Sequence, residues 1–116
     1  MPIMLTLSAF REGNEANQLQ GTVFVKTEAT HTVQQITNAF CRWSSLPADK
    51  CALHLNNQRL EPSMTAASAG LQNGIAVIVL IASDAPEPGE AARSAGFTVV
   101  DVMDSEMADL AGGFGL

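Results

Sequence analysis

The chain has 116 residues, of which 47% are hydrophobic and 16% are charged, and this length suits one domain rather than two. Its net charge of −6 is unevenly distributed, because residues 1–83 hold five basic and five acidic residues whereas residues 84–116 hold one basic and seven acidic residues. A neutral body with an acidic end argues against nucleic-acid binding, which depends on Lys and Arg at phosphates, and against a polybasic membrane anchor.

The sequence predicts neither a metal centre nor an enzyme. Cys41 and Cys51 are too few for a disulfide framework, and no spacing of cysteines and histidines matches a zinc site. No nucleophile–base constellation or phosphate-binding loop is visible, so we expect a non-catalytic protein without a cofactor. The longest apolar run, residues 75–82, is far shorter than the roughly 20 residues of a membrane helix, and the N-terminus lacks a basic signal-peptide region. We therefore expect a soluble protein of a reducing compartment.

The first third of the chain predicts a hairpin. Ile3, Leu5 and Leu7 alternate with less apolar residues, which is the period of two of a half-buried strand. Residues 11–20 are polar and form a connection, and the alternation around Val23 and Val25 indicates a second strand.

The period changes at Thr32, where a helix is predicted over residues 33–44. Thr32 and Gln35 fit a capping box, and Pro47 ends the helix because the residue before a proline disfavours the α region. One face of this helix is apolar and carries Val33, Ile36, Phe40 and Trp43.

The next residues predict three more strands. Leu53 and Leu55 alternate, the pair Asn56-Asn57 suits a turn with positive φ, and a short strand follows near residues 58–60. Residues 61–74 form a loop, and the apolar residues 75–81 indicate a central strand. The order of elements predicts an α+β fold of the β-grasp type, in which a mixed sheet of four or five strands packs on one helix.

The composition changes again at Asp84. We therefore expect a domain over residues 1–83, a linker rich in Pro, Glu and Gly over residues 84–96, and a flexible acidic tail over residues 97–116.

Three stretches resemble the ubiquitin-like superfamily, and most closely its SUMO branch, over roughly residues 3–82. The stretch AFCRWSSL at residues 39–46 is similar to the end of the SUMO helix, and NQRL at residues 57–60 resembles the turn and strand of SUMO proteins. Leu46-Pro47-x-Asp49 resembles a passage of ubiquitin. The resemblance implies a β-grasp domain of the cytoplasm or nucleus of a eukaryotic cell.

The resemblance also implies a protein-binding groove between the second strand and the helix. A partner strand would add beside the second strand by β-augmentation, and Lys26 would receive acidic residues that flank it. Four of the matching residues also suit a simple core, whereas alternation points Phe24 away from Val23 and Val25. The corresponding positions are Val23, Phe24, Val25, Lys26, Ile36 and Phe40.

A second candidate surface corresponds to the sheet patch of ubiquitin. It consists of His54, Ile78 and Leu80. Because Ile78 and Leu80 alternate with Val77 and Val79, these two pairs cannot all face the helix. Ile78 and Leu80 either form an exposed interface or lie under the tail, and His54 is otherwise an ordinary surface histidine.

The tail contains a segment that resembles a SUMO-interacting motif, in which valines precede acidic residues. We hypothesise that this segment binds back on its own domain or on a neighbouring copy. A helix through Val99, Val102, Met103, Met107 and Leu110 and a disordered acidic tail remain as alternatives. The residues of the motif are Val99, Val100, Val102, Asp104 and Glu106.

The end of the chain offers one more function. Gly112-Gly113 resembles the processing site of a conjugated modifier, although about 30 residues separate it from the last predicted strand of the domain. Our leading interpretation is a non-catalytic ubiquitin-like interaction domain, the N-terminal module of a scaffold or adaptor. The alternatives are a modifier precursor processed after Gly113 and a self-associating structural module.

Overall fold

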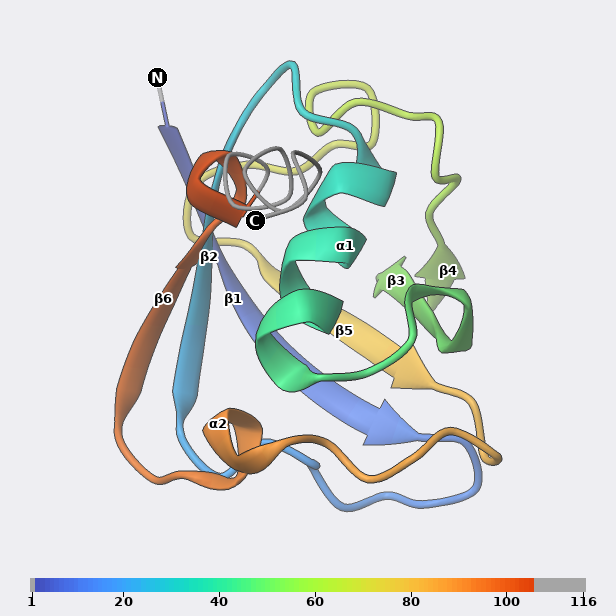
Figure 1. The fold of residues 1–116 in the computed structure, drawn as a ribbon. Coiled ribbons are helices and arrows are strands. Elements are labelled where there is room, and N and C mark those ends of the chain that lie inside the picture. The colour runs from blue at the N-terminus through green and yellow to red at the C-terminus, as the bar shows by residue number, and fades with distance from the viewer. Residues whose placement is uncertain (1, 106–116) are drawn as a thin grey trace, which may run out of the picture.

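The computed structural model describes residues 2–105, which form a mixed sheet with a helix across one face (Figure 1). Residues 102–105 form a helical turn. The elements in chain order are β1 (Pro2–Arg11), β2 (Thr22–Glu28), α1 (Val33–Ser44), the 3-10 turn η1 (Ala48–Lys50), β3 (Cys51–Leu55), β4 (Gln58–Arg59), β5 (Ala76–Ile81), α2 (Glu90–Arg93) and β6 (Phe97–Asp101).

The strand order β4-β3-β5-β1-β2-β6 is that of a β-grasp sheet with one added strand. β1 and β2 form the predicted antiparallel hairpin, whereas β1 and β5 run parallel and are joined by the crossover that contains α1. The predicted α+β class and β-grasp fold are confirmed. The sheet of residues 2–105 has six strands rather than four or five, because β6 comes from the segment that was expected to be a flexible tail.

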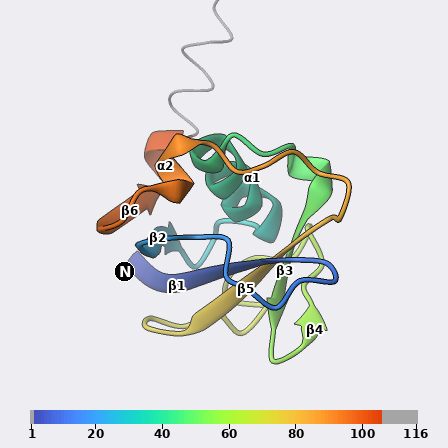
Figure 2. The ribbon, with the colours of Figure 1, turned by 90° about the horizontal axis from the view of Figure 1, so that it is seen from below.

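Helix α1 covers one face of the sheet and builds the core with it. The predicted range of residues 33–44 and the capping box are confirmed: Gln35 N–H donates to Thr32 Oγ1 at 3.1 Å, and Thr32 N–H donates to Gln35 Oε1 at 2.7 Å. Ile36 and Phe40 are fully buried against the sheet. Figure 2 shows α1 and α2 above one face of the sheet and no helix on the opposite face.

The strands alternate as their sequences predict. Val77 and Val79 of β5 are buried on the α1 side, so Ile78 and Leu80 lie on the other face. The turn between β3 and β4 has φ of 53° at Asn56 and 66° at Asn57, which confirms the expected positive φ.

The predicted linker, residues 84–96, is a packed segment that we call the strap. Pro88 and Ala92 are buried, and Gly89 N–H donates to the carbonyl of Ser44 at the end of α1 at 2.6 Å. The Arg11 guanidinium donates to the carbonyls of Ala82, Ala85 and Pro86 at 3.2, 2.7 and 2.9 Å.

The packing therefore does not end at residue 83, where the sequence suggested a domain boundary. Composition indicated a linker because Pro, Glu and Gly are common in flexible segments. The partners that hold the strap, Arg11 and Ser44, lie far away in the sequence and give no local signal.

Candidate protein-binding site

The tail segment lies where the sequence places a partner strand. β6 runs parallel to β2, with Val23 opposite Thr98, Phe24 opposite Val99, and Val25 opposite Val100. α1 contacts β6 as well, so β6 extends the sheet beside the helix. This arrangement is the one that the hypothesis of a tail bound to its own domain describes. We call the edge of β2 beside α1 the strand-addition site, defined by Val23, Phe24, Val25, Lys26, Ile36 and Phe40.

One side of the tail segment fills the space under α1. Val100 is 7% exposed and Val102 is fully buried. Of the predicted site residues, Val23, Val25, Ile36 and Phe40 are buried in the same core cluster as these two valines. The residues that suit the core therefore also form the floor on which Val100 and Val102 pack.

The other side of the tail segment is exposed on the open face of the sheet. The rings of Phe24 and Phe97 are 5.0 Å apart between centroids and inclined by 48°. Phe97 is 71% exposed and Val99 is 42% exposed. Phe24 thus points away from the core, as alternation indicates, and supports the tail segment from the opposite face.

Two glycines allow the tail segment to begin beside β2. Thr22 N–H donates to the Gly96 carbonyl at 2.8 Å, and Gly96 has a φ of +122°, which L side chains rarely adopt. A Cβ atom on Gly21 would lie 2.5 Å from the Gly96 carbonyl oxygen, which is closer than atoms can approach.

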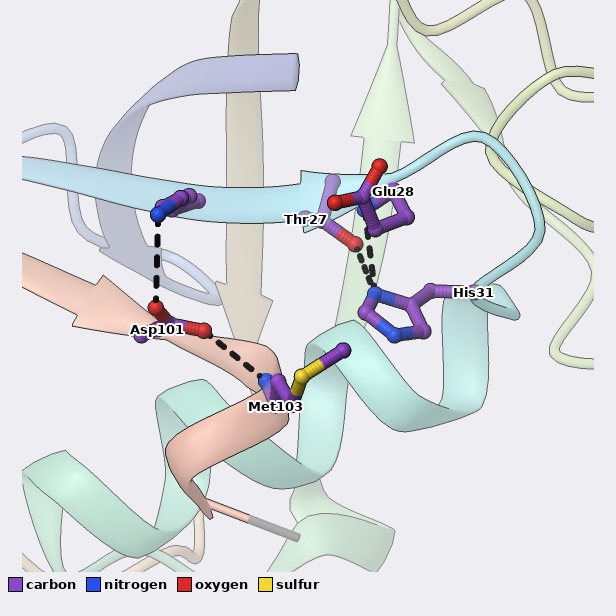
Figure 3. A network of polar contacts seen from close by, with 6 residues as sticks. Thr27, Glu28, His31, Asp101 and Met103 are labelled. Atoms are coloured by element: carbon purple, nitrogen blue, oxygen red, sulfur yellow. Dashed lines mark hydrogen bonds and ion pairs between the residues drawn. The ribbon is translucent and has the colours of Figure 1, made fainter. Parts of the chain in front are cut away.

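A polar network closes the far end of the strand-addition site (Figure 3). Lys26 Nζ lies 3.8 Å from Asp101 Oδ2, and Asp101 Oδ1 accepts the Met103 N–H at 3.0 Å. His31 Nδ1 accepts the Glu28 N–H at 3.0 Å and lies 2.9 Å from Thr27 Oγ1. These groups line a cavity of about 80 Å³. Sequence reasoning found Lys26 but missed Thr27 and His31, whose pairing depends on the bend after β2.

The predicted tail motif is only partly within the described chain. Val99 and Val100 lie in β6, whereas Val102 and Asp104 lie in the following helical turn, so neither a full strand nor a full helix describes the motif. Glu106, Gly112 and Gly113 lie outside the described residues, as do Met107 and Leu110 of the helical alternative.

The second predicted surface lies on the open face of the sheet. Ile78 is 39% exposed and stands between His54 of β3 and Ser8 of β1, while Leu80 stands between Ala52 and Phe10. The described part of the tail pairs with β2, on the far side of β1 from this surface. We call His54, Ile78 and Leu80 the sheet patch.

Two further observations concern residues 2–105. They contain no group of three or more His, Cys, Asp or Glu side chains that could hold a metal ion. Over the same range, every helix is too short or too polar to cross a membrane.

Comparisons with known proteins identify the fold. Residues 15–81 match the family model described as ubiquitin-2 like Rad60 SUMO-like. Among solved structures, the chain is similar to the UBL domain of Plasmodium falciparum Dsk2, with a TM-score of 0.57 and 14% identity over 70% of this chain and 99% of that chain. A search of curated proteins gave no significant match. The family match ends at residue 81, so the strap and β6 lie beyond it.

Proposed function

Because the chain belongs to the ubiquitin-2-like, SUMO-like Rad60-SLD family, we propose that it is a non-catalytic interaction domain that binds an extended segment of a partner protein at the strand-addition site. In this role the domain recruits other proteins and serves a scaffold or adaptor. Affinity comes from the backbone of β2, and selectivity comes from the side chains under α1.

The observation that carries this proposal is the position of β6. The chain's own segment Phe97–Asp101 pairs with β2 over five residues and buries Val100 against the core that α1 covers. A partner with β-branched residues at alternate positions would make the same backbone bonds and fill the same space.

The charges at the site support a partner with an acidic residue after its apolar positions. Lys26 is the basic group opposite Asp101, and both side chains are partly exposed, which gives the pair a modest energy but a defined register. The partner strand is thereby expected to run parallel to β2, as β6 does.

The tail segment then acts as a competitor of the partner. A segment tethered to its own site has an effective concentration on the order of millimolar, so a free peptide of the same sequence has to overcome that concentration. Partners of the strand-addition site would bind tightly only when the tail segment leaves β2.

A peptide-binding experiment on the full chain tests this function. The substitutions Val100→Asp and Val102→Asp together place carboxylates in the core position and release the tail segment. A fluorescent peptide with the sequence of residues 97–105 is titrated with this double variant and with the wild type, and its anisotropy is measured. We expect saturable binding to the double variant and at least tenfold weaker binding to the wild type.

A matched variant and a matched peptide complete the test. Val99→Asp changes an exposed valine of the same strand and should leave the wild-type behaviour intact. A peptide with Asp in place of both buried valines should not bind. If the folded double variant binds neither peptide at millimolar concentration, the strand-addition site does not receive partner strands.

The sheet patch is a second candidate surface because it remains open. Ile78 is a large apolar side chain that is 39% exposed, and exposed apolar side chains that adjoin one another often mark interfaces. We propose that this patch contacts a different class of partner, a folded receptor rather than a strand. The variant Ile78→Asp should lose such a receptor in a binding assay, whereas Phe24→Ala should retain it; retention by both variants would exclude the patch.

A further inference from the structure

Two cysteines that the proposed function does not use face each other between α1 and β3. Cys41 is 3% exposed and lies on the buried face of α1. Cys51 begins β3 and stands opposite the buried Ile81, so its side chain lies on the α1 side of the sheet. Both are free thiols, and their side chains are hydrogen-bonded to each other.

The local geometry explains this meeting. Thr37 precedes Cys41 by one helical turn, and Thr37 and Cys51 line one cavity of about 130 Å³ between the helix and β3. η1 turns the chain directly after α1 and delivers Cys51 back to the helix. The contact therefore bridges the first residue of a strand and the last part of the helix that covers it.

The two thiols have different chemical characters. The hydrogen bond from Cys41, together with the positive charge of Arg11, lowers the pKa of Cys51 in spite of its partial burial. The same contact and the burial of Cys41 raise the pKa of Cys41 well above its ordinary value. Cys51 is thus the sulfur that carries a thiolate, and Cys41 is the thiol that donates to it.

Access differs in the same sense. Cys51 is partly exposed and lines both the cavity beside α1 and an open cleft of about 300 Å³ on the other side of β3. A small oxidant can therefore reach Cys51, whereas Cys41 lies behind it in the core.

We propose that Cys51 and Cys41 form a peroxide-oxidisable dithiol, in which Cys51 reacts first and Cys41 resolves the product to a disulfide. The Cys51 thiolate attacks one oxygen of hydrogen peroxide, the O–O bond breaks, and the departing hydroxide takes a proton to become water. This step leaves a sulfenic acid on Cys51. The Cys41 sulfur then attacks the Cys51 sulfur, the S–O bond breaks, and the hydroxyl leaves as water with the Cys41 proton. In sum, two thiols and one peroxide give one disulfide and two waters.

Oxidation of the purified full chain tests the assignment. After brief treatment with hydrogen peroxide, we expect the intact wild-type chain to lose the mass of two hydrogen atoms and to show no free thiol. The variant Cys41→Ser should stop at the sulfenic acid, which dimedone traps on Cys51. The variant Cys51→Ser should keep Cys41 unmodified over the same time.

A rate measurement separates this proposal from simple exposure. Alkylation of Cys51 by iodoacetamide below its pKa depends on the thiolate fraction, so Cys41→Ala should slow it about tenfold for each unit that the pKa of Cys51 rises. Circular dichroism establishes that each variant is folded. Equal alkylation rates in the wild type and in Cys41→Ala, or peroxide that oxidises Cys51 to sulfinic acid without any disulfide in the wild type, would overturn the proposal.

Discussion

Asp101 joins the tail segment to the body and also starts the next turn. One carboxylate oxygen lies 3.8 Å from Lys26, while the other accepts the Met103 N–H and so caps the helical turn of residues 102–105. The ion pair is partly exposed to solvent, so it contributes little free energy, whereas the cap satisfies a backbone donor that otherwise has no helical partner.

Two substitutions at Asp101 separate these roles. Asp101→Asn keeps a capping oxygen and loses the charge, and Asp101→Ala loses both. We expect docking of the tail segment to weaken by a few tenths of a kcal/mol in the first variant and by about 1 kcal/mol in the second. Amide hydrogen exchange of residues 98–101 measures the docking. An effect as large for Asn as for Ala would assign the main role to the charge.

Lys50 and Asp84 give a second residue-scale prediction, on pH. Lys50 Nζ donates to Asp84 Oδ2 at 2.9 Å, which lowers the pKa of Asp84 from its usual 3.8 and raises that of Lys50 from its usual 10.5. A lowered carboxyl pKa stabilises the fold above the unfolded value and loses this effect as the pH falls through the folded value. A raised lysine pKa stabilises the fold below 10.5 and loses its effect at higher pH.

The pair should therefore contribute to stability between these limits only. We expect Asp84→Asn to lower the free energy of unfolding slightly at neutral pH, and the difference from the wild type to vanish as the pH falls below 3.8. Urea unfolding at several pH values measures this difference, since urea does not screen charge. Glu87→Gln, a nearby exposed carboxylate, is the control and should show no such pH dependence.

At the scale of elements, β6 depends on the close approach of Gly21 to Gly96. Gly21 has no positive φ, so alanine suits its backbone, and the only penalty is the approach of the new Cβ to the Gly96 carbonyl at 2.5 Å. Gly21→Ala should thus displace the start of β6 without harming the hairpin that β1 and β2 form.

Hydrogen exchange tests this expectation. The amides of β6 should exchange about tenfold faster or more in Gly21→Ala, because each 1.4 kcal/mol of lost docking energy raises the open population tenfold. The amides of β5, in the middle of the sheet, serve as the internal control and should be unchanged. Unchanged exchange in β6 would mean that the two backbones can separate at no cost.

At the scale of the whole molecule, the strap and tail segment belong to the body. They place Ala92, Val100 and Val102 in the main core cluster, and Arg11 and Ser44 hold the strap along its length. The body that matches the family model therefore shares its core with residues that lie beyond that match.

Truncation after residue 83 measures this contribution. Burying a valine side chain contributes about 1.5–3 kcal/mol, partly offset by the entropy of ordering the segment. We expect the shortened chain to keep its fold and to lose about 2–4 kcal/mol of unfolding free energy, with a smaller urea m-value because less surface is exposed on unfolding. Identical midpoints and slopes for both chains would show that residues 84–105 do not pack on the body.

The sequence by itself determined the parts whose signals are local. The boundaries of α1 follow from Thr32, Gln35 and the apolar stripe, and the turn at Asn56-Asn57 follows from the residues' tolerance of positive φ. Alternation placed Phe24 and Ile78 on the face opposite the core. These features depend on neighbours within a few residues, and a periodic pattern records them directly.

Only the tertiary structure decided what the last part of the chain does. Composition gave residues 84–96 as a linker, but Arg11 and Ser44 bind its backbone from distant positions. The valine motif was compatible with a strand, a helix or disorder, because a short apolar segment takes its conformation from the surface it meets. Here that surface is the free edge of β2 beside α1, and its backbone groups and buried floor made the segment a strand.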